Sequence, residues 1–154
     1  MNRNSVMKLL YFLILFALAA GGCEKKQTTD EVHEAFTQPL QGRWMNDLDK
    51  ALTEAQKSNK PLIVMISEPD CRWCIKMKKG ALSDPRVQKQ LERYLLVRIR
   101  RSDRVQSSKI ESFDGKIPSF FLLSPKGEVV DAIVGYYKPD DFLGYLQEIT
   151  EELK

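Results

Sequence analysis

The pair of cysteines in residues 68–80, EPDCRWCIKMKKG, constrains the fold of this chain more than any other feature of its sequence. Residues 62–66, LIVMI, come just before it and form a continuous apolar run, which is typical of a buried central strand. The sequence after the pair continues as a helix. Because Cys71 and Cys74 are three residues apart, both sulfurs lie on the same side of the first helical turn, within reach of a disulfide. We therefore expect a buried strand that leads directly to a dithiol at the start of a helix.

The place of this dithiol predicts reactive thiols. Amide groups and the dipole at a helix N-terminus favour a thiolate, so Cys71 should have the lower pKa of the two cysteines. Arg72 adds a positive charge that acts in the same direction, and Trp73 can shield the pair or offer an apolar docking surface. The predicted chemistry is thiol–disulfide exchange, in which Cys71 attacks the disulfide of a partner and Cys74 resolves the mixed disulfide.

Three other interpretations of the pair have less support. A zinc site requires four ligands, and the chain offers one histidine, His33, and no second cysteine pair, so we expect no metal. A purely structural disulfide that closes so short a loop would stabilise the fold little. An inert buried pair is disfavoured because thiol reactivity is expected where a cysteine pair lies between a strand and a helix.

The first 22 residues predict an export signal. Arg3 and Lys8 precede an apolar run at residues 9–20, and a membrane-spanning helix needs a longer run of about 20 apolar residues. An uncleaved N-terminal anchor is the alternative, since the run extends through two glycines toward the length of a thin span.

The end of this segment, ALAAGGC, resembles a bacterial lipobox, with Ala20 in place of the more common leucine. The resemblance implies that the signal is cut just before Cys23 and that Cys23 then carries lipid. Lipid chains on Cys23 would hold the protein at a membrane through buried methylene groups. This assignment also removes the odd thiol from the redox chemistry.

Residues 24–43 are polar and lack periodicity, so we expect a flexible tether in which His33 is exposed to solvent. Without residues 1–22 the chain carries 22 Lys and Arg residues against 21 Asp and Glu residues, a balance that gives no support for nucleic-acid binding. The remaining length suits one domain with its own core. The predicted organisation is a signal peptide (1–22), a tether with lipidated Cys23 (23–43) and one folded domain (44–154).

The folded part alternates helical and extended patterns. Helices are predicted at 44–60, from the cysteine pair onward, at 83–94 and at 138–154, with one helical stretch near 105–113. Strands are predicted at 62–66, 94–100, 118–124 and 128–135. The early strand–helix–strand crossover implies parallel pairing, and the late hairpin implies antiparallel pairing. The predicted fold class is α/β, with a mixed central sheet and helices on both of its faces.

The motifs described so far resemble the thioredoxin superfamily, across roughly residues 44–153. Downstream of the dithiol, KIPSFFLLSPKGEVVDAIVGYYKPDDFLGYL looks like the second half of a thioredoxin-like domain. In that family an X-Pro bond is cis and faces the dithiol, and the resemblance gives this place to Ile117 and Pro118. It implies that these two residues shape the surface on which an extended substrate segment docks. Phe120, Phe121, Tyr136 and Tyr137 are expected to pack in the core and hairpin rather than to bind a ligand.

The segment CRWCIKMKKGALSDPRVQKQL is similar to the C-terminal thioredoxin-like domain of the thiol:disulfide interchange protein DsbD. That resemblance implies thiol–disulfide exchange outside the cytoplasm, most often in the reducing direction. The implied partners are protein disulfides and an upstream thiol protein that donates electrons. No cofactor is implied beyond the Cys71–Cys74 disulfide itself, and a monomer is expected.

Two positions depart from the family pattern. Many members have a buried Asp six residues before the first cysteine, where this chain has Met65, and Trp is usual just before that cysteine, where this chain has Asp70. Glu68 or Asp70 can take over the proton transfer of the missing acid, and a solvated loop carboxylate is the alternative interpretation of each. Because Asp70 opposes Arg72 electrostatically, the sequence leaves the pKa of Cys71 and the redox potential of the dithiol open.

Together these features predict a lipid-anchored thiol–disulfide oxidoreductase on the periplasmic side of a bacterial cell envelope. We expect it to reduce disulfides in exported proteins. A dithiol oxidase or isomerase of the same fold is the first alternative. A non-catalytic thioredoxin-like binding or chaperone module is the second, and the retention of both cysteines argues against it.

Overall fold

The computed structural model describes residues 43–152 of the chain. The predicted signal peptide, the lipid acceptor Cys23 and His33 lie outside these residues. Within the part that is described, no helix is long and apolar enough to cross a membrane.

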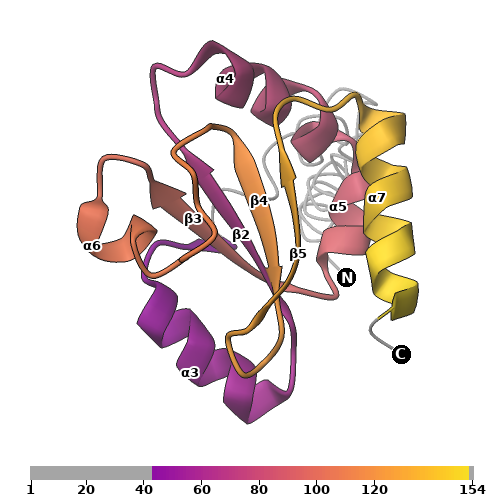
Figure 1. The fold of residues 1–154 in the computed structure, drawn as a ribbon. Coiled ribbons are helices and arrows are strands. Elements are labelled where there is room, and N and C mark those ends of the chain that lie inside the picture. The colour runs from indigo at the N-terminus through magenta and orange to yellow at the C-terminus, as the bar shows by residue number, and fades with distance from the viewer. Residues whose placement is uncertain (1–42, 153–154) are drawn as a thin grey trace, which may run out of the picture. The chain divides into compact units, whose positions relative to one another are not determined.

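A five-stranded mixed sheet forms the centre of the domain (Figure 1). Its strands lie in the order β1-β3-β2-β4-β5, in which β1, β3 and β2 are parallel and β4 and β5 are antiparallel to their neighbours. The strands are β1 (Trp44–Met45), β2 (Leu62–Ser67), β3 (Leu95–Arg100), β4 (Ser119–Leu123) and β5 (Val129–Val134). The helices are α3 (Leu48–Ser58), α4 (Arg72–Lys79), α5 (Pro85–Leu91), α6 (Arg104–Ser107) and α7 (Pro139–Glu152), with a 3-10 turn at Ala81–Ser83.

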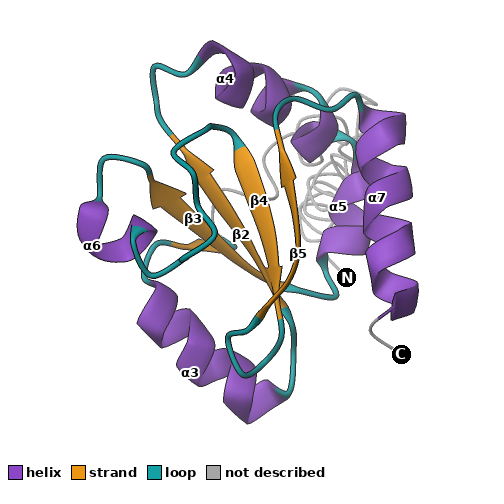
Figure 2. Ribbon diagram, viewed as in Figure 1, coloured by secondary structure: helices purple, strands orange, loops and turns teal. Residues whose placement is uncertain are grey.

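Helices cover both faces of this sheet, as the sequence predicts (Figure 2). Successive side chains of β2 point to opposite faces, so Ile63 and Met65 pack in one core cluster with α4, α5 and α7. Val64 and Ile66 pack in a second cluster with α3. All six residues of β2 are buried, which is the pattern of a central strand covered on both sides.

The helix predicted at 44–60 is wrong at its start. Trp44 and Met45 form a short strand that pairs in parallel with β3. Trp44 packs against one core cluster and Met45 against the other, because neighbouring residues of a strand face opposite sides of the sheet. The helix begins only at Leu48, where the Asp47 carboxylate caps it by accepting from the Lys50 amide.

The helical stretch predicted near 105–113 is also shorter than expected. Only Arg104–Ser107 is helical, capped by Asp103, and turns continue from there to Phe113. The helix predicted at 83–94 covers Pro85–Leu91, with Asp84 as its N-cap and Pro85 in its first turn. The four predicted strands are confirmed at 62–67, 95–100, 119–123 and 129–134.

The side chain of Gln106 ties α6 to the start of α3, and its removal should lower the free energy of unfolding. Gln106 Oε1 accepts a hydrogen bond from the Leu48 amide at 2.8 Å, in a partly buried place. Gln106→Ala leaves this amide without its partner, so we expect a loss of about 1 to 2 kcal/mol in urea denaturation. The matched control is Gln56→Ala, exposed on α3, which should change the value by less than about 0.5 kcal/mol. Equal effects of the two substitutions would contradict the capping role.

Candidate active site

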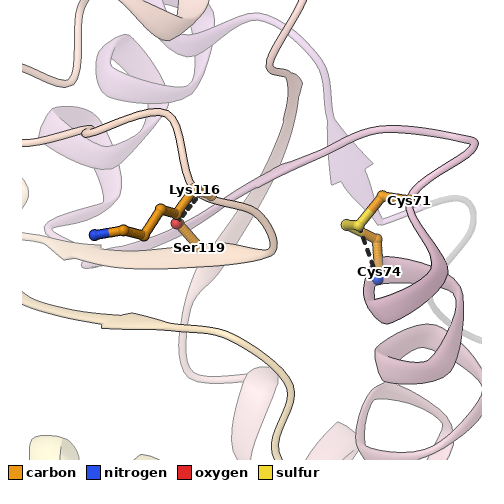
Figure 3. The surroundings of a disulfide bond; sticks show 4 residues. All are labelled: Cys71, Cys74, Lys116 and Ser119. Atoms are coloured by element: carbon orange, nitrogen blue, oxygen red, sulfur yellow. Dashed lines mark hydrogen bonds between the residues drawn. A yellow bond between two sulfur atoms is a disulfide. The ribbon is translucent and has the colours of Figure 1, made fainter.

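The two predicted cysteines form a disulfide at the N-terminus of α4 (Figure 3). Cys71 is the N-cap of the helix and Cys74 lies in its first turn, with a Cα–Cα distance of 5.2 Å. The Cys74 amide donates a hydrogen bond to Cys71 Sγ at 3.1 Å. Cys71 is half-buried, whereas Cys74 is only 1% exposed. The two sulfurs therefore differ in access to a partner and in the polar groups that they meet.

The local sequence places Cys71 at this position through backbone hydrogen bonds. The Cys71 amide donates to the Glu68 carbonyl at 3.3 Å and closes the turn that follows β2. The Ile75 amide donates to the Cys71 carbonyl at 3.0 Å and opens α4. A cap side chain normally accepts from the amide two or three residues further on, and here a sulfur takes the role of the usual oxygen. After reduction, the same amide and the helix dipole favour a thiolate on Cys71.

Met65 lies at the position where many family members have a buried acid. It is 1% exposed and belongs to the same core cluster as Cys74 and Met77. The cluster around Cys74 is thus apolar at this position. An apolar environment disfavours a charged thiolate, so this position is less favourable for a negative charge than the helix N-terminus at Cys71.

The two loop acids proposed for proton transfer have different environments. The Glu68 carboxylate accepts a hydrogen bond from the Ser102 amide. This bond, with the nearby charge of Arg101, lowers the pKa of Glu68 below its usual value. A carboxylate that accepts a proton efficiently near neutral pH needs a raised pKa instead. Asp70 is exposed, and a proton-transfer role for either acid stays a prediction.

The segment predicted to face the dithiol enters the sheet beside it. The peptide bond between Ile117 and Pro118 is cis, as the resemblance implied. Pro118 is buried and precedes β4, whose first residue, Ser119, pairs with Ile66 near the end of β2. Ile117 and Cys71 pack against the same core cluster. The structure therefore brings Ile117 and Pro118 to the edge of the sheet from which the dithiol follows.

Hydrogen bonds hold this segment in place. The Ser119 hydroxyl donates to the carbonyl of Lys116 at 2.6 Å, across the cis bond (Figure 3). The Lys116 side chain points away from the disulfide and pairs with Asp114. The Lys116 charge is therefore directed away from the dithiol.

Trp73 lies on the surface beside the dithiol. It is 46% exposed, and its ring packs at 5.8 Å from that of Tyr136. The Arg72 guanidinium lies 5.5 Å from the centre of the Trp73 ring. Trp73 therefore offers the exposed apolar surface that was one of its two predicted roles.

Two residues beside the dithiol, Lys76 and Tyr136, make contacts there that the sequence did not predict. Phe120 and Phe121 are buried in the core as expected, and Tyr136, half-buried, packs both against the core cluster and on Trp73. Lys76 Nζ lies 4.4 Å from the Tyr136 ring centre and 5.2 Å from that of Trp73. The spacing from Arg72 to Lys76 is one helical turn, a signal available in the sequence. Across residues 43–152 no group of three or more His, Cys, Asp and Glu side chains could hold a metal ion.

The described domain has a mixed sheet, a disulfide at a helix N-terminus and a cis proline at the same edge of the sheet. This combination defines a thiol–disulfide oxidoreductase of the thioredoxin fold. Residues 48–150 match the family model described as thioredoxin-like domain, and the chain belongs to that family. No protein with a curated description matches the chain in sequence.

Solved structures show the same fold. A thioredoxin from Thermus thermophilus is 27% identical, with 70% of this chain and 86% of that one covered and a TM-score of 0.60. The DsbD C-terminal domain from Neisseria meningitidis in the oxidised form is 22% identical, with 68% and 97% covered and a TM-score of 0.56. A disulphide isomerase from Xylella fastidiosa is 16% identical, with 67% and 88% covered and a TM-score of 0.57.

Replacing Glu68 should destabilise the protein in a pH-dependent way. The pKa of this carboxyl is lowered from 4.5, so its stabilising effect is present above the unfolded value and is lost as pH falls through the lower folded value. The melting temperature of Glu68→Gln should be below that of the wild type at about pH 7, and the two should converge toward about pH 3. Thermal unfolding followed by circular dichroism measures both. Glu54→Gln, exposed on α3, is the control, and a Glu68 effect that stays constant with pH would contradict a role for the charge.

Proposed function

We propose that this protein is a membrane-anchored, extracytoplasmic thiol–disulfide oxidoreductase that reduces disulfides in exported proteins. The observation that carries the proposal is the inequality of the two sulfurs. Cys71 is half-buried at the helix N-terminus and accepts from the Cys74 amide, whereas Cys74 is 1% exposed. An accessible sulfur that is stabilised as a thiolate suits attack, and a buried neighbour one turn away suits resolution.

The reaction starts from the reduced protein. The Cys71 thiolate attacks one sulfur of the partner's disulfide, and the other partner sulfur leaves and takes a proton. Cys74 then loses its proton and attacks Cys71 Sγ, which breaks the mixed disulfide and releases the partner as a dithiol. Two electrons pass from the protein to its partner, and the Cys71–Cys74 disulfide seen in the structure is the product.

Arg72, Trp73, Ile117 and Pro118 are proposed to form the docking surface for the partner. Trp73 supplies exposed apolar area beside the dithiol. The segment at Ile117 and Pro118 lies at the same edge of the sheet as the dithiol, and its backbone is proposed to pair with an extended partner segment. We propose Asp70, an exposed loop carboxylate that precedes Cys71 in sequence, as the acceptor of the proton in the resolving step.

The direction and the location rest on the resemblances. The similarity to the DsbD C-terminal domain favours electron flow from an upstream thiol protein, through this dithiol, to disulfides of exported proteins. The lipobox-like sequence before Cys23 favours a lipid anchor on the periplasmic side of a bacterial cell envelope. The proposed cofactor set is the dithiol alone.

Cysteine variants test the proposed chemistry with insulin as the disulfide substrate and dithiothreitol as the electron source. The wild type should accelerate insulin reduction, and Cys71→Ser should be no faster than dithiothreitol alone because the attacking sulfur is gone. In a separate incubation without dithiothreitol, pre-reduced Cys74→Ser should accumulate a mixed disulfide with insulin, seen as a mass increase that dithiothreitol then removes. Equal acceleration by the wild type and Cys71→Ser would favour a non-catalytic binding module.

Equilibration with glutathione tests the direction. A reductase should have a potential toward the reducing end of the thioredoxin range, near about −270 mV. A value near about −120 mV, where strong dithiol oxidants lie, would contradict the reductase proposal and favour the oxidase.

The anchor is tested at Cys23. Cys23→Ala should lose its lipid and the cut that depends on it, so we expect accumulation of the uncut precursor without lipid label. Metabolic labelling with a fatty acid and the apparent mass on a gel measure both. A variant that keeps its full mass and fractionates with membranes in the same way as the wild type would favour the uncleaved N-terminal anchor.

A further inference from the structure

The exposed face of α4 carries a row of positive charges that starts next to the attacking sulfur. Arg72, Lys76 and Lys79 follow one another at helical spacing, and the row runs about 10 Å along the helix axis. All three are exposed. The sequence contains no acidic residue between Cys71 and Ser83. These three cations therefore meet no negative charge from their own helix.

Within the described residues, no carboxylate forms an ion pair with Arg72, Lys76 or Lys79. Within residues 43–152 the ion pairs are made by cations of other elements, which are Arg43, Lys50, Arg86, Lys109 and Lys116. The two acids that precede this helix, Glu68 and Asp70, also lie near other donors or cations. Glu68 accepts from the Ser102 amide, and Asp70 shares its pocket with Arg101 and Arg104.

Aromatic rings hold two of the cations at the surface. Lys76 lies over both Trp73 and Tyr136, and Arg72 lies over Trp73. A cation held on a ring face keeps its full charge for an incoming anion, and no carboxylate of residues 43–152 forms an ion pair with either of these two. Between the cations lie two exposed apolar side chains, Trp73 at 46% and Ile75 at 40%. Such mixed surfaces, with apolar anchors among charges of one sign, are suited to protein partners.

We propose that Arg72, Trp73, Ile75, Lys76 and Lys79, here called the α4 docking face, bind an acidic segment next to the reacting disulfide of a partner protein. The proposal rests on the proposed function and specifies the substrate class of its site. The positive charge of the face favours an acidic segment, and its position beside Cys71 favours a protein partner over a membrane. The row begins at Arg72, beside Cys71, so a membrane lying on it would cover the sulfur that must reach a disulfide.

Two peptide probes test this inference. Each contains one intramolecular disulfide, flanked by glutamates in one peptide and by lysines in the other. The reduced wild type should oxidise faster with the acidic peptide by at least about tenfold at about 10 mM ionic strength, where charges act over about 30 Å. The ratio of the two rates should fall toward one at about 1 M salt, where screening leaves about 3 Å. Because each ratio compares the two peptides with the same protein, differences in Cys71 reactivity between variants cancel.

A pair of matched variants locates the effect. Lys76→Glu/Lys79→Glu should bring the ratio at low salt to about one or below, and Lys57→Glu/Lys60→Glu, an equal charge change at the end of α3, should keep most of it. Equal loss in both variants would overturn the α4 docking face in favour of overall charge. Equal rates of the wild type with both peptides would also overturn it.

Two further outcomes separate the alternatives. Absence of reaction with either peptide would overturn the proposed function, because the docking face acts only on exchange that occurs. Equal peptide rates, together with binding to phosphatidylglycerol vesicles that Lys76→Glu/Lys79→Glu loses, would overturn the acidic protein partner and identify the face as a membrane contact.

Discussion

The burial of β2 is the constraint on which the rest of the site depends. All six of its residues are buried, and it pairs with β3 on one side and β4 on the other. Because β4 runs antiparallel to β2, the segment that enters β4 and the segment that leaves β2 lie at the same edge of the sheet. Cys71 follows β2 and Pro118 precedes β4, so one set of strand pairings places both halves of the site. The backbone hydrogen bonds between these strands thus position the two loops that hold Cys71 and Pro118.

The different roles proposed for the two sulfurs follow from their positions. Cys71 meets the amide at the start of α4, and Cys74 meets an apolar cluster that includes Met65. An acid at position 65 would be buried among apolar side chains and would cost free energy whenever it ionised. Met65 avoids that cost and gives up the nearby proton acceptor. In the proposed mechanism the negative charge is therefore favoured on Cys71 by its position, and groups nearer the solvent accept the proton of Cys74.

Local patterns in the sequence predicted the structural features that depend on residues close together in the chain. The run at 62–66, the spacing of Cys71 and Cys74, and the hairpin between β4 and β5 were all confirmed. The short strand at Trp44 and Met45 was not predicted, because two residues show no periodicity and their apolar character continues the pattern of the helix that follows. The Trp73, Tyr136 and Lys76 contacts join segments far apart in sequence. Tyr136 packs against the core as predicted, and only the fold shows that it also contacts α4.

An exchange protein must release its partner after each reaction, and this requirement bears on the kind of surface that suits it. A large apolar interface gives slow dissociation, whereas charges mainly raise the rate of encounter and orient the approach. Trp73 and Ile75 offer limited apolar area, and the cations around them lack carboxylate partners within the described domain. Apolar contact can then stabilise the encounter while charge guides the partner's disulfide toward Cys71. Since Arg72 and Lys76 lie over aromatic rings and form no ion pair within residues 43–152, an acidic segment can bind them without breaking an ion pair of the described domain.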